Sequence, residues 1–240
     1  MSLKTSNLPF KARVDHEVHN TIMRKAVVKA QETIGANRQK MVDELGHWEE
    51  WRDLSKQIRN HVLANLDAYL YQLSEKVIEN GGKVYFAETA EEASAYIRKV
   101  ALEKNAKKIV KSKSMVTEEI GLNEVLEKEG MQVIETDLGE YLLQISGDKP
   151  SHIVVPAIHK DRHQIRKDLS EKLGYQGEET PEDMTRFVRE KIRQDFLEAD
   201  IGISGCNFAV AETGSVCLVT NEGNLRLATT LPKTHIAVMG

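Results

Sequence analysis

Hydrophobic and polar positions follow two patterns, helical in the first third of the chain and strand-then-helix in the rest. Residues 10–44 are polar, with a weak helical stripe, and predict a helical arm. Residues 46–51 predict a break whose two tryptophans anchor the arm. In residues 52–79 apolar positions recur three and four apart, which predicts one amphipathic helix ending at Gly81-Gly82. Its predicted buried face comprises Leu54, Ile58, Val62, Leu66, Tyr69, Leu73 and Val77.

Short apolar runs then alternate with amphipathic segments. The predicted strands are residues 84–86, 108–110, 131–134, 152–155, 201–210, 216–220 and 235–238. The predicted helices are residues 89–103, 114–128 with a break near Gly121, 137–145, 161–173, and a helix starting at Thr180 with its buried face running to Phe196. This alternation predicts an α/β fold of three layers, a mainly parallel sheet covered by helices. We place the arm at residues 1–51 and the α/β domain at residues 52–240.

Residues 199–230 are poor in charge and rich in Gly, Val, Ile and Thr. The runs 201–210 and 216–220 predict two buried strands joined by a turn at residues 212–215, with a second polar turn at residues 221–224. Loops on a buried scaffold are where functional sites tend to lie.

Composition and charge narrow the function classes. The net charge of −4 gives no support for nucleic-acid binding. The sequence has no apolar stretch of membrane-spanning length and no apolar signal core at its start, so we expect a cytoplasmic protein. The chain ends directly after a predicted strand, and we expect it to be one domain of a longer protein.

Cys206 and Cys217 are the two cysteines of the chain. If Thr213-Gly214 forms a two-residue hairpin turn, Val210 lies opposite Cys217, and Cys206 lies roughly 13 Å away at about 3.3 Å per residue. A disulfide needs Cα atoms within about 7 Å. We therefore expect two buried, free thiols.

Lysines gather around the predicted strand at residues 108–110. Lys111 and Lys113 follow its carboxyl end, and either Ser114 or Thr117 is placed to cap the next helix. Ligands of open α/β sheets bind at this edge, so these residues predict an anion site, with a solvated basic rim as the alternative. The remaining lysines of the group are Lys104, Lys107 and Lys108.

The turn at residues 212–215, between the predicted strands 201–210 and 216–220, carries Glu212, the best candidate for a reactive carboxylate. Partial burial there would raise its pKa; the alternative is an ordinary turn residue. Glu222, beside Asn221 and Asn224, is a weaker candidate of the same kind. The full set of candidate ligand-binding residues is Lys111, Lys113, Ser114, Glu212, Thr213, Gly214, Ser215 and Asn224.

Histidine spacing does not support a metal site. His159 and His163 are four residues apart, but no glutamate follows the first as in the zincin motif, and neighbouring Lys160 and Arg162 disfavour a cation. His16 and His19 give no better support for a metal site. We predict no metal in this chain.

Five segments together resemble the lactate utilization protein B family, iron–sulfur subunits of a three-protein bacterial system that oxidises L-lactate. They are KKIVKSKSMVTEEI at residues 107–120, ETDLGEYLLQ at 135–144, SHIVVPAIHK at 151–160, EADIGISGCNFAVAETGSVCLVTNEGN at 198–224 and LPKTHIAVMG at 231–240. The resemblance implies a LUD-type domain with a fold like the sugar-isomerase and CoA-transferase superfamily. It also implies a ferredoxin-like domain beyond Gly240 that holds two 4Fe-4S clusters, whose cysteine runs this chain lacks.

The resemblance implies a domain of an electron-transfer subunit in the oxidation of L-lactate to pyruvate. This domain would dock the sister subunits and bind a small organic acid, and by itself it is not expected to be catalytic. One alternative is an acyl- or CoA-handling enzyme with Glu212 as nucleophile, because CoA transferases place a glutamate in a strand-end turn. The other alternative is a purely structural assembly domain.

Overall fold

The computed structural model describes residues 8–151 and 155–240, apart from the side chains of residues 16, 17 and 22. These residues form two units. Of the described residues, the sheet unit contains 8–9, 86–208 and 217–240, and the helical unit contains 10–85 and 209–216. The boundary placed after Trp51 remains a prediction.

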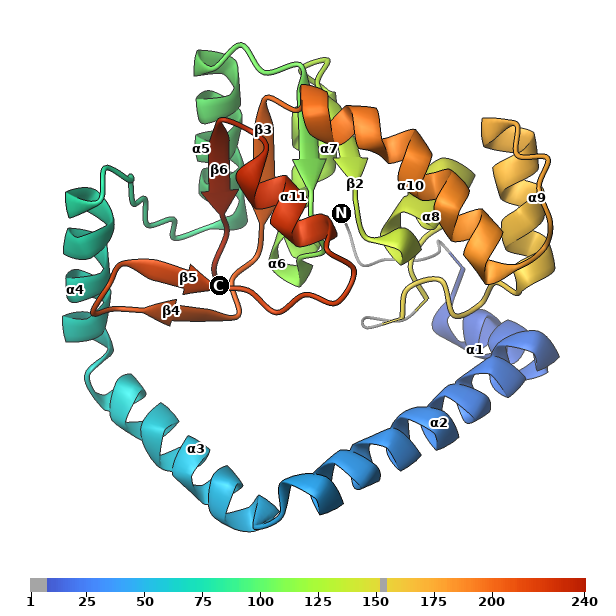
Figure 1. Cartoon of the computed structure of the whole chain (residues 1–240), viewed down its shortest axis with the longest axis horizontal. Coiled ribbons are helices and arrows are strands. Elements are labelled where there is room, and N and C mark those ends of the chain that lie inside the picture. Colours follow the sequence, from blue (N-terminus) through green and yellow to red (C-terminus); the bar gives the residue numbers. More distant parts are fainter. Residues whose placement is uncertain (1–7, 152–154) are drawn as a thin grey trace. The chain divides into compact units, whose positions relative to one another are not determined.

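The sheet unit is built on four parallel strands in the order β2-β1-β3-β6 (Figure 1). The strands are β1 (Lys108–Lys111), β2 (Gln132–Glu135), β3 (Ile201–Ser204) and β6 (Thr234–Ala237). The predicted parallel sheet is thus confirmed.

Helices cover both faces of this sheet, which gives the predicted three layers. Alternate residues of a strand point to opposite faces, and Val110 and Ile134 pack in one apolar cluster while Ile109 and Val133 pack in the other. The first cluster is covered by α8 (Leu138–Ser146), α9 (Arg162–Leu173), α10 (Pro181–Glu198) and α11 (Asn224–Thr230). The second is covered by α5 (Ala90–Glu103) and α7 (Leu122–Glu127), the latter preceded by the short α6 (Met115–Glu119).

The helix starts follow local side-chain chemistry. The hydroxyls of Thr89, Ser114 and Thr180 each accept a hydrogen bond from the backbone N–H three residues on, at 3.1, 3.3 and 3.3 Å. These bonds satisfy amides that a helix leaves without an internal partner. The helix starts predicted at Thr89 and Thr180 are therefore confirmed, and of the two candidates Ser114 and Thr117 it is Ser114 that caps α6.

Close packing between β3 and α11 requires a glycine. A Cβ atom built on Gly202 would overlap the backbone carbonyl oxygen of Ala228, and both residues are buried. Only a residue without a side chain lets the helix backbone approach the strand this closely.

The helical unit consists of four helices and most of a hairpin. The helices are α1 (Phe10–His19), α2 (Thr21–Leu45), α3 (Trp48–Ala64) and α4 (Leu66–Glu79), and the hairpin strands are β4 (Phe208–Val210) and β5 (Ser215–Cys217). The single helix predicted for residues 52–79 is wrong, because Asn65 leaves helical geometry at φ −130° and ψ 30°. The break predicted at residues 46–51 is only two residues long, and Trp51, inside α3, is half exposed rather than an anchor.

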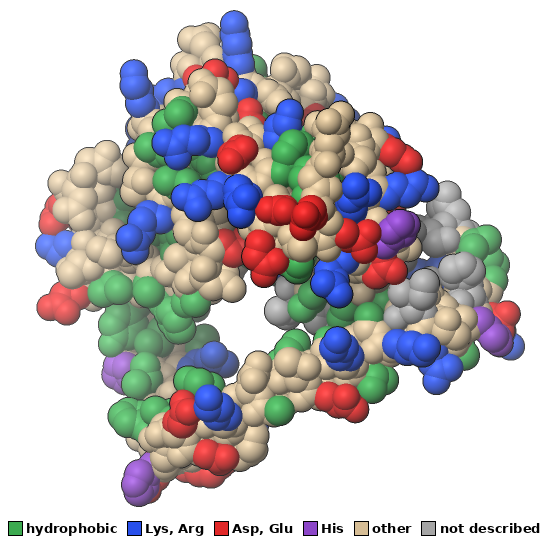
Figure 2. Space-filling view, turned by 45° about the vertical axis from the view of Figure 1, so that its right-hand side comes forward, with side chains coloured by type: hydrophobic (Ala, Val, Ile, Leu, Met, Phe, Trp, Pro, Cys, Tyr) green, Lys and Arg blue, Asp and Glu red, His purple; other side chains and the backbone are tan. Residues whose placement is uncertain are grey.

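The predicted buried face of residues 52–79 is also wrong. No described residue of α3 or α4 is buried, and Leu54 and Ile58 are 45% and 57% exposed. Apolar side chains reach the surface of the helical segments in Figure 2. A helical period shows which side chains share a face, but burial also needs an element that covers this face.

Three strand predictions need correction. Residues 84–86 are exposed and form no strand, and the strand predicted over 201–210 divides at Gly205 into β3 and β4. β3 is buried as predicted, whereas β4 and β5 are exposed. The strand predicted at 152–155 falls mostly on residues outside the described ones. None of the described helices is both long and apolar enough to cross a membrane.

Candidate functional site

The carboxyl ends of β1 and β2 bring charged side chains together within the sheet unit. β1 is followed by Ser112, Lys113 and Ser114, and β2 by Thr136 and Asp137. Because the strands are parallel and neighbours, both loops leave the same edge of the sheet, where ligands of such sheets bind.

Lys111 lies below this edge, with a fully buried side chain. Its ammonium lies 2.9 Å from Glu135 Oε1 and 2.7 Å from Glu118 Oε1, and it donates to Thr117 Oγ1 at 3.1 Å. Burial lowers the pKa of Lys111, but Glu135 and Glu118 together raise it above its usual value. Lys111 therefore stays charged, with its charge balanced inside the protein.

Lys113 lies nearer the surface and meets the carboxyl group of Glu140 on α8. Lys113 Nζ is 2.7 Å from Glu140 Oε1. Burial, followed by a side-chain hydrogen bond with Asp137, raises the pKa of Glu140 to about 8, although Lys113 acts in the opposite direction. At neutral pH Glu140 is therefore mainly a neutral acid next to a charged lysine.

Glu222 brings a third carboxyl group to this edge. Its Oε2 accepts from the backbone N–H of Leu138 at 3.2 Å, and Asp137 Oδ1 accepts from that of Gly139 at 3.3 Å, so both cap the start of α8. Burial, and then Asp137, raise the pKa of Glu222.

Thr136 connects further candidates. Its hydroxyl donates to the carbonyl oxygen of Lys111 at 3.0 Å and accepts from Asn224 Nδ2 at 3.3 Å. Ser114, predicted as a ligand residue, is buried, caps α6 and lies beside Gly205, where an added Cβ would come within 3.1 Å of its hydroxyl.

The sequence reasoning did not identify Asp137 and Glu140 as site residues. Both lie in the segment ETDLGE, where an N-cap aspartate is followed three residues later by a glutamate. This pattern indicated a helix start, and a lysine two residues beyond the neighbouring strand was the only hint of a charge partner.

The other four candidates belong to the helical unit. Glu212 is an exposed turn residue, so the partial burial expected for it is wrong. Thr213 donates its hydroxyl hydrogen to Ser215 Oγ at 3.0 Å and accepts at its carbonyl from Asn80 Nδ2 at 3.0 Å. Gly214, at φ +68°, packs so closely on α4 that a Cβ would lie 2.7 Å from backbone atoms of Lys76 and Val77. This turn thus has a clear structural role against α4.

The two cysteines are free, as predicted, but their placement differs from the prediction. Cys206 is half-buried and Cys217 is exposed. The backbone N–H of Asn207, not that of Val210, lies opposite Cys217, donating to its carbonyl at 3.1 Å. The turn is wider than two residues, since the carbonyl of Val210 accepts from both Thr213 and Gly214.

The other lysine and histidine candidates interact with side chains away from the sheet edge. Lys108 forms ion pairs with Asp195 and Glu198 at 2.8 and 2.7 Å. His159 bonds to Ser151 at 2.7 Å, whereas His163 meets Glu179 at 3.1 Å. Within the described ranges, no cluster of His, Cys, Asp or Glu is arranged to hold a metal ion.

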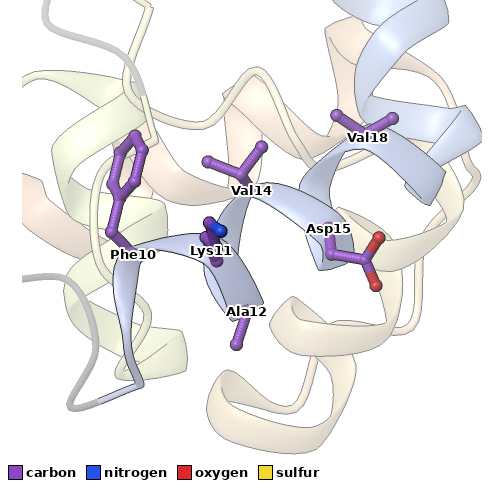
Figure 3. Close-up of a pocket in the computed structure, with 6 residues that line it drawn as sticks. All are labelled: Phe10, Lys11, Ala12, Val14, Asp15 and Val18. Atoms are coloured by element: carbon purple, nitrogen blue, oxygen red, sulfur yellow. The ribbon is translucent and has the colours of Figure 1, made fainter.

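A surface hollow of about 550 Å³ lies beside α1 (Figure 3). The described side chains that line it come from this one helix: Phe10, Lys11, Ala12, Val14, Asp15 and Val18. Binding sites usually combine an apolar cavity with polar groups converging from several elements. We therefore take the carboxyl edge of the sheet, not this hollow, as the candidate site.

Comparison with known proteins gives a consistent family. Residues 70–240 match the family model of the LUD domain. The chain is 73% identical over 240 residues to the "uncharacterized electron transport protein YkgF" of Escherichia coli K12, covering all of this chain and 50% of that protein. It is 62% identical over 241 residues to lactate utilization protein B of Bacillus subtilis and 60% over 241 residues to that of Bacillus pumilus, covering all of this chain and 50% and 51% of those proteins. The chain thus spans about half the length of these relatives. No solved structure matches it significantly.

Proposed function

Because the chain belongs to the LUD domain family, we propose that it is the LUD part of a longer electron-transfer protein in the use of lactate. The observation that carries this proposal is the 62% identity, across the whole chain, to half of a protein named for lactate utilization. The name of the Escherichia coli relative, an electron transport protein, supports the redox role. Oxidation of L-lactate to pyruvate releases a pair of electrons and a pair of protons, and such a protein would accept the electrons.

We propose that the redox cofactors of this function are bound by the second half of the protein, which corresponds to the part of the longer relatives that this chain does not match. A 4Fe-4S cluster is held by four cysteine thiolates. This chain has only Cys206 and Cys217, so its own residues do not fit a cluster. We therefore assign the two expected clusters to a ferredoxin-like second half and route no electron through this domain.

The LUD domain would serve binding and assembly in the cytoplasm. The exposed apolar faces of α3 and α4 offer a surface for the sister subunits of the lactate system. The charged edge of the sheet, with Lys113, Ser114 and Asn224 among its residues and Lys111 buried beneath, would bind a small organic acid. On this proposal the domain alone does not oxidise lactate.

A chimera tests the proposal directly. The matching half of Bacillus subtilis lactate utilization protein B is replaced by this chain, and the fusion is produced in a strain that lacks the native protein. We expect growth on L-lactate as the carbon source to be restored, because the two halves are 62% identical.

Iron analysis is the second measurement on the same fusion. Purified without oxygen, it should hold about eight irons, as two 4Fe-4S clusters require, whereas the 240-residue chain should hold none. A fusion that accumulates with its iron but does not support growth on lactate, while the native protein does, would overturn the proposal.

A further inference from the structure

We propose that Lys113 and Glu140 form the binding site of a small carboxylate whose oxygens accept hydrogen bonds from the lysine ammonium and from the carboxylic acid of Glu140. The residues and the donor chemistry follow from the geometry of the sheet edge. The inference deepens the organic-acid site of the function proposed above, and the choice of lactate and pyruvate as probes rests on that function.

The two groups are held as a pair by separate elements. Lys113 follows β1, Glu140 lies in the first turn of α8 after β2, and their charged atoms are 2.7 Å apart. Their side chains are 26% and 13% exposed, so they are largely shielded from water but still accessible. A carboxylate that reaches such a pair interacts more strongly than it would at a fully exposed lysine.

One carboxyl oxygen of Glu140 does not face Lys113. Oε1 faces Lys113, whereas Oε2 is buried and has no hydrogen-bond partner in the described part of the chain. A buried polar atom left without a partner is costly. When Glu140 is neutral, Oε2 can carry the proton, for which the Asp137 carboxylate and a ligand oxygen are the two acceptors. A carboxylate ligand would satisfy this donor and also meet the lysine charge.

A second buried atom without a partner lies next to Lys113 in the sequence. Ser112 is 1% exposed, and its Oγ has no hydrogen-bond partner among the described residues. A hydroxyl can donate as well as accept. It is an unused polar group at the same strand end, independent of the two charged residues.

The other charges of this edge are already engaged. The carboxylates of Asp137 and Glu222 accept backbone hydrogen bonds at the start of α8, which partly offsets their negative charge. The groups that act on the protonation of Glu140 are Asp137, which favours the neutral acid, and Lys113, which opposes it. Binding should therefore weaken as the pH rises through about 8, because ionised Glu140 loses its donor and competes for Lys113.

The experiment is a titration of the 240-residue chain with sodium L-lactate and with sodium pyruvate, followed by NMR or calorimetry. We expect saturable binding that falls about tenfold between about pH 7 and about pH 9, because a group with a pKa of about 8 loses its proton over this range. Lys113→Met should weaken binding at least about tenfold. Glu140→Gln, which keeps a donor but cannot ionise, should bind at neutral pH and lose the fall at high pH.

Lys108→Met is the matched control, since Lys108 lies at the other end of β1 and also pairs with carboxylates. It should bind both probes as the unaltered chain does. Binding that is unchanged in Lys113→Met, a pH profile that is unchanged in Glu140→Gln, or no saturable binding of either probe would overturn the inference. Growth of the chimera on lactate is a separate readout. Binding can therefore refute the site while the lactate function stands, and failed growth can refute the lactate function while the site stands.

Discussion

The ammonium of Lys111 lies 2.9 Å from the carboxylate of Glu135, and the two residues are register partners on adjacent parallel strands. The Lys111 side chain is fully buried and that of Glu135 is 5% exposed. Burial raises the pKa of Glu135, while Lys111 and Asn123 act in the opposite direction. Each charge is thus tolerated in the core because the other is present.

Removing the lysine should therefore destabilise the sheet unit strongly. Lys111→Met leaves the carboxylate of Glu135 buried without its cation, and we expect a loss of about 3–5 kcal/mol in the free energy of unfolding. Urea denaturation followed by circular dichroism measures it. Lys108→Met, whose partners Asp195 and Glu198 are more exposed, should cost no more than about 1 kcal/mol.

The double variant Lys111→Met/Glu135→Leu separates the pair from its surroundings. It removes both buried charges, so it should recover much of the stability lost in Lys111→Met. If the double variant is as unstable as the sum of the two single variants, the two side chains do not compensate each other.

Gly202 is the second position where a small change should have a large effect. Gly202→Ala places a methyl group onto the carbonyl of Ala228, and either β3 or α11 must move. We expect a loss of about 3 kcal/mol or more, beyond the usual cost of overpacking, because the contact is with backbone. Gly35→Ala on α2 is the control: nothing lies within 4 Å of the added atom, so it should be neutral or stabilising by up to about 1 kcal/mol.

The sheet unit could be read from the sequence because its signals are local. Thr89 and Thr180-Pro181 mark helix starts, because each threonine hydroxyl accepts a hydrogen bond from the backbone N–H three residues on. β1 and β2 are short apolar runs followed by helices. Alternation of strand and helix then restricts the fold to a covered parallel sheet.

The errors concern relationships that no local pattern contains. The period of residues 52–79 shows an apolar face, but not that it stays exposed or that Asn65 interrupts the helix. The hairpin register depends on turn width, which Thr213-Gly214 alone does not fix. The pairing of Lys113 with Glu140 depends on two strands being neighbours, which the tertiary fold decides.

The hairpin turn at residues 212–215 should matter for structure through Gly214 rather than through Glu212. Gly214→Ala combines a left-handed backbone at φ +68° with a clash against α4, so we expect it to destabilise the helical unit by about 1–3 kcal/mol. Glu212→Gln, at an exposed position, should change stability by less than about 0.5 kcal/mol. Limited proteolysis together with urea denaturation compares the two; equal effects would show that the packing of Gly214 on α4 is not important.

The pH dependence of stability should show the burial of His235. Burial lowers the pKa of His235 below its usual 6.5, and its Nε2 lies 2.8 Å from the hydroxyl of buried Ser204. Below pH 6.5 the unfolded chain binds a proton that the folded chain does not, so the free energy of unfolding should fall as the pH drops, by up to about 1.4 kcal/mol for each unit by which the pKa is lowered. Above pH 6.5 this contribution is constant.

The measurement is the urea midpoint of unfolding between about pH 5 and about pH 8. The change of this midpoint with pH should be smaller in His235→Gln and unchanged in His19→Gln, because His19 is exposed. Equal slopes in all three proteins would show that protonation of His235 is not coupled to folding.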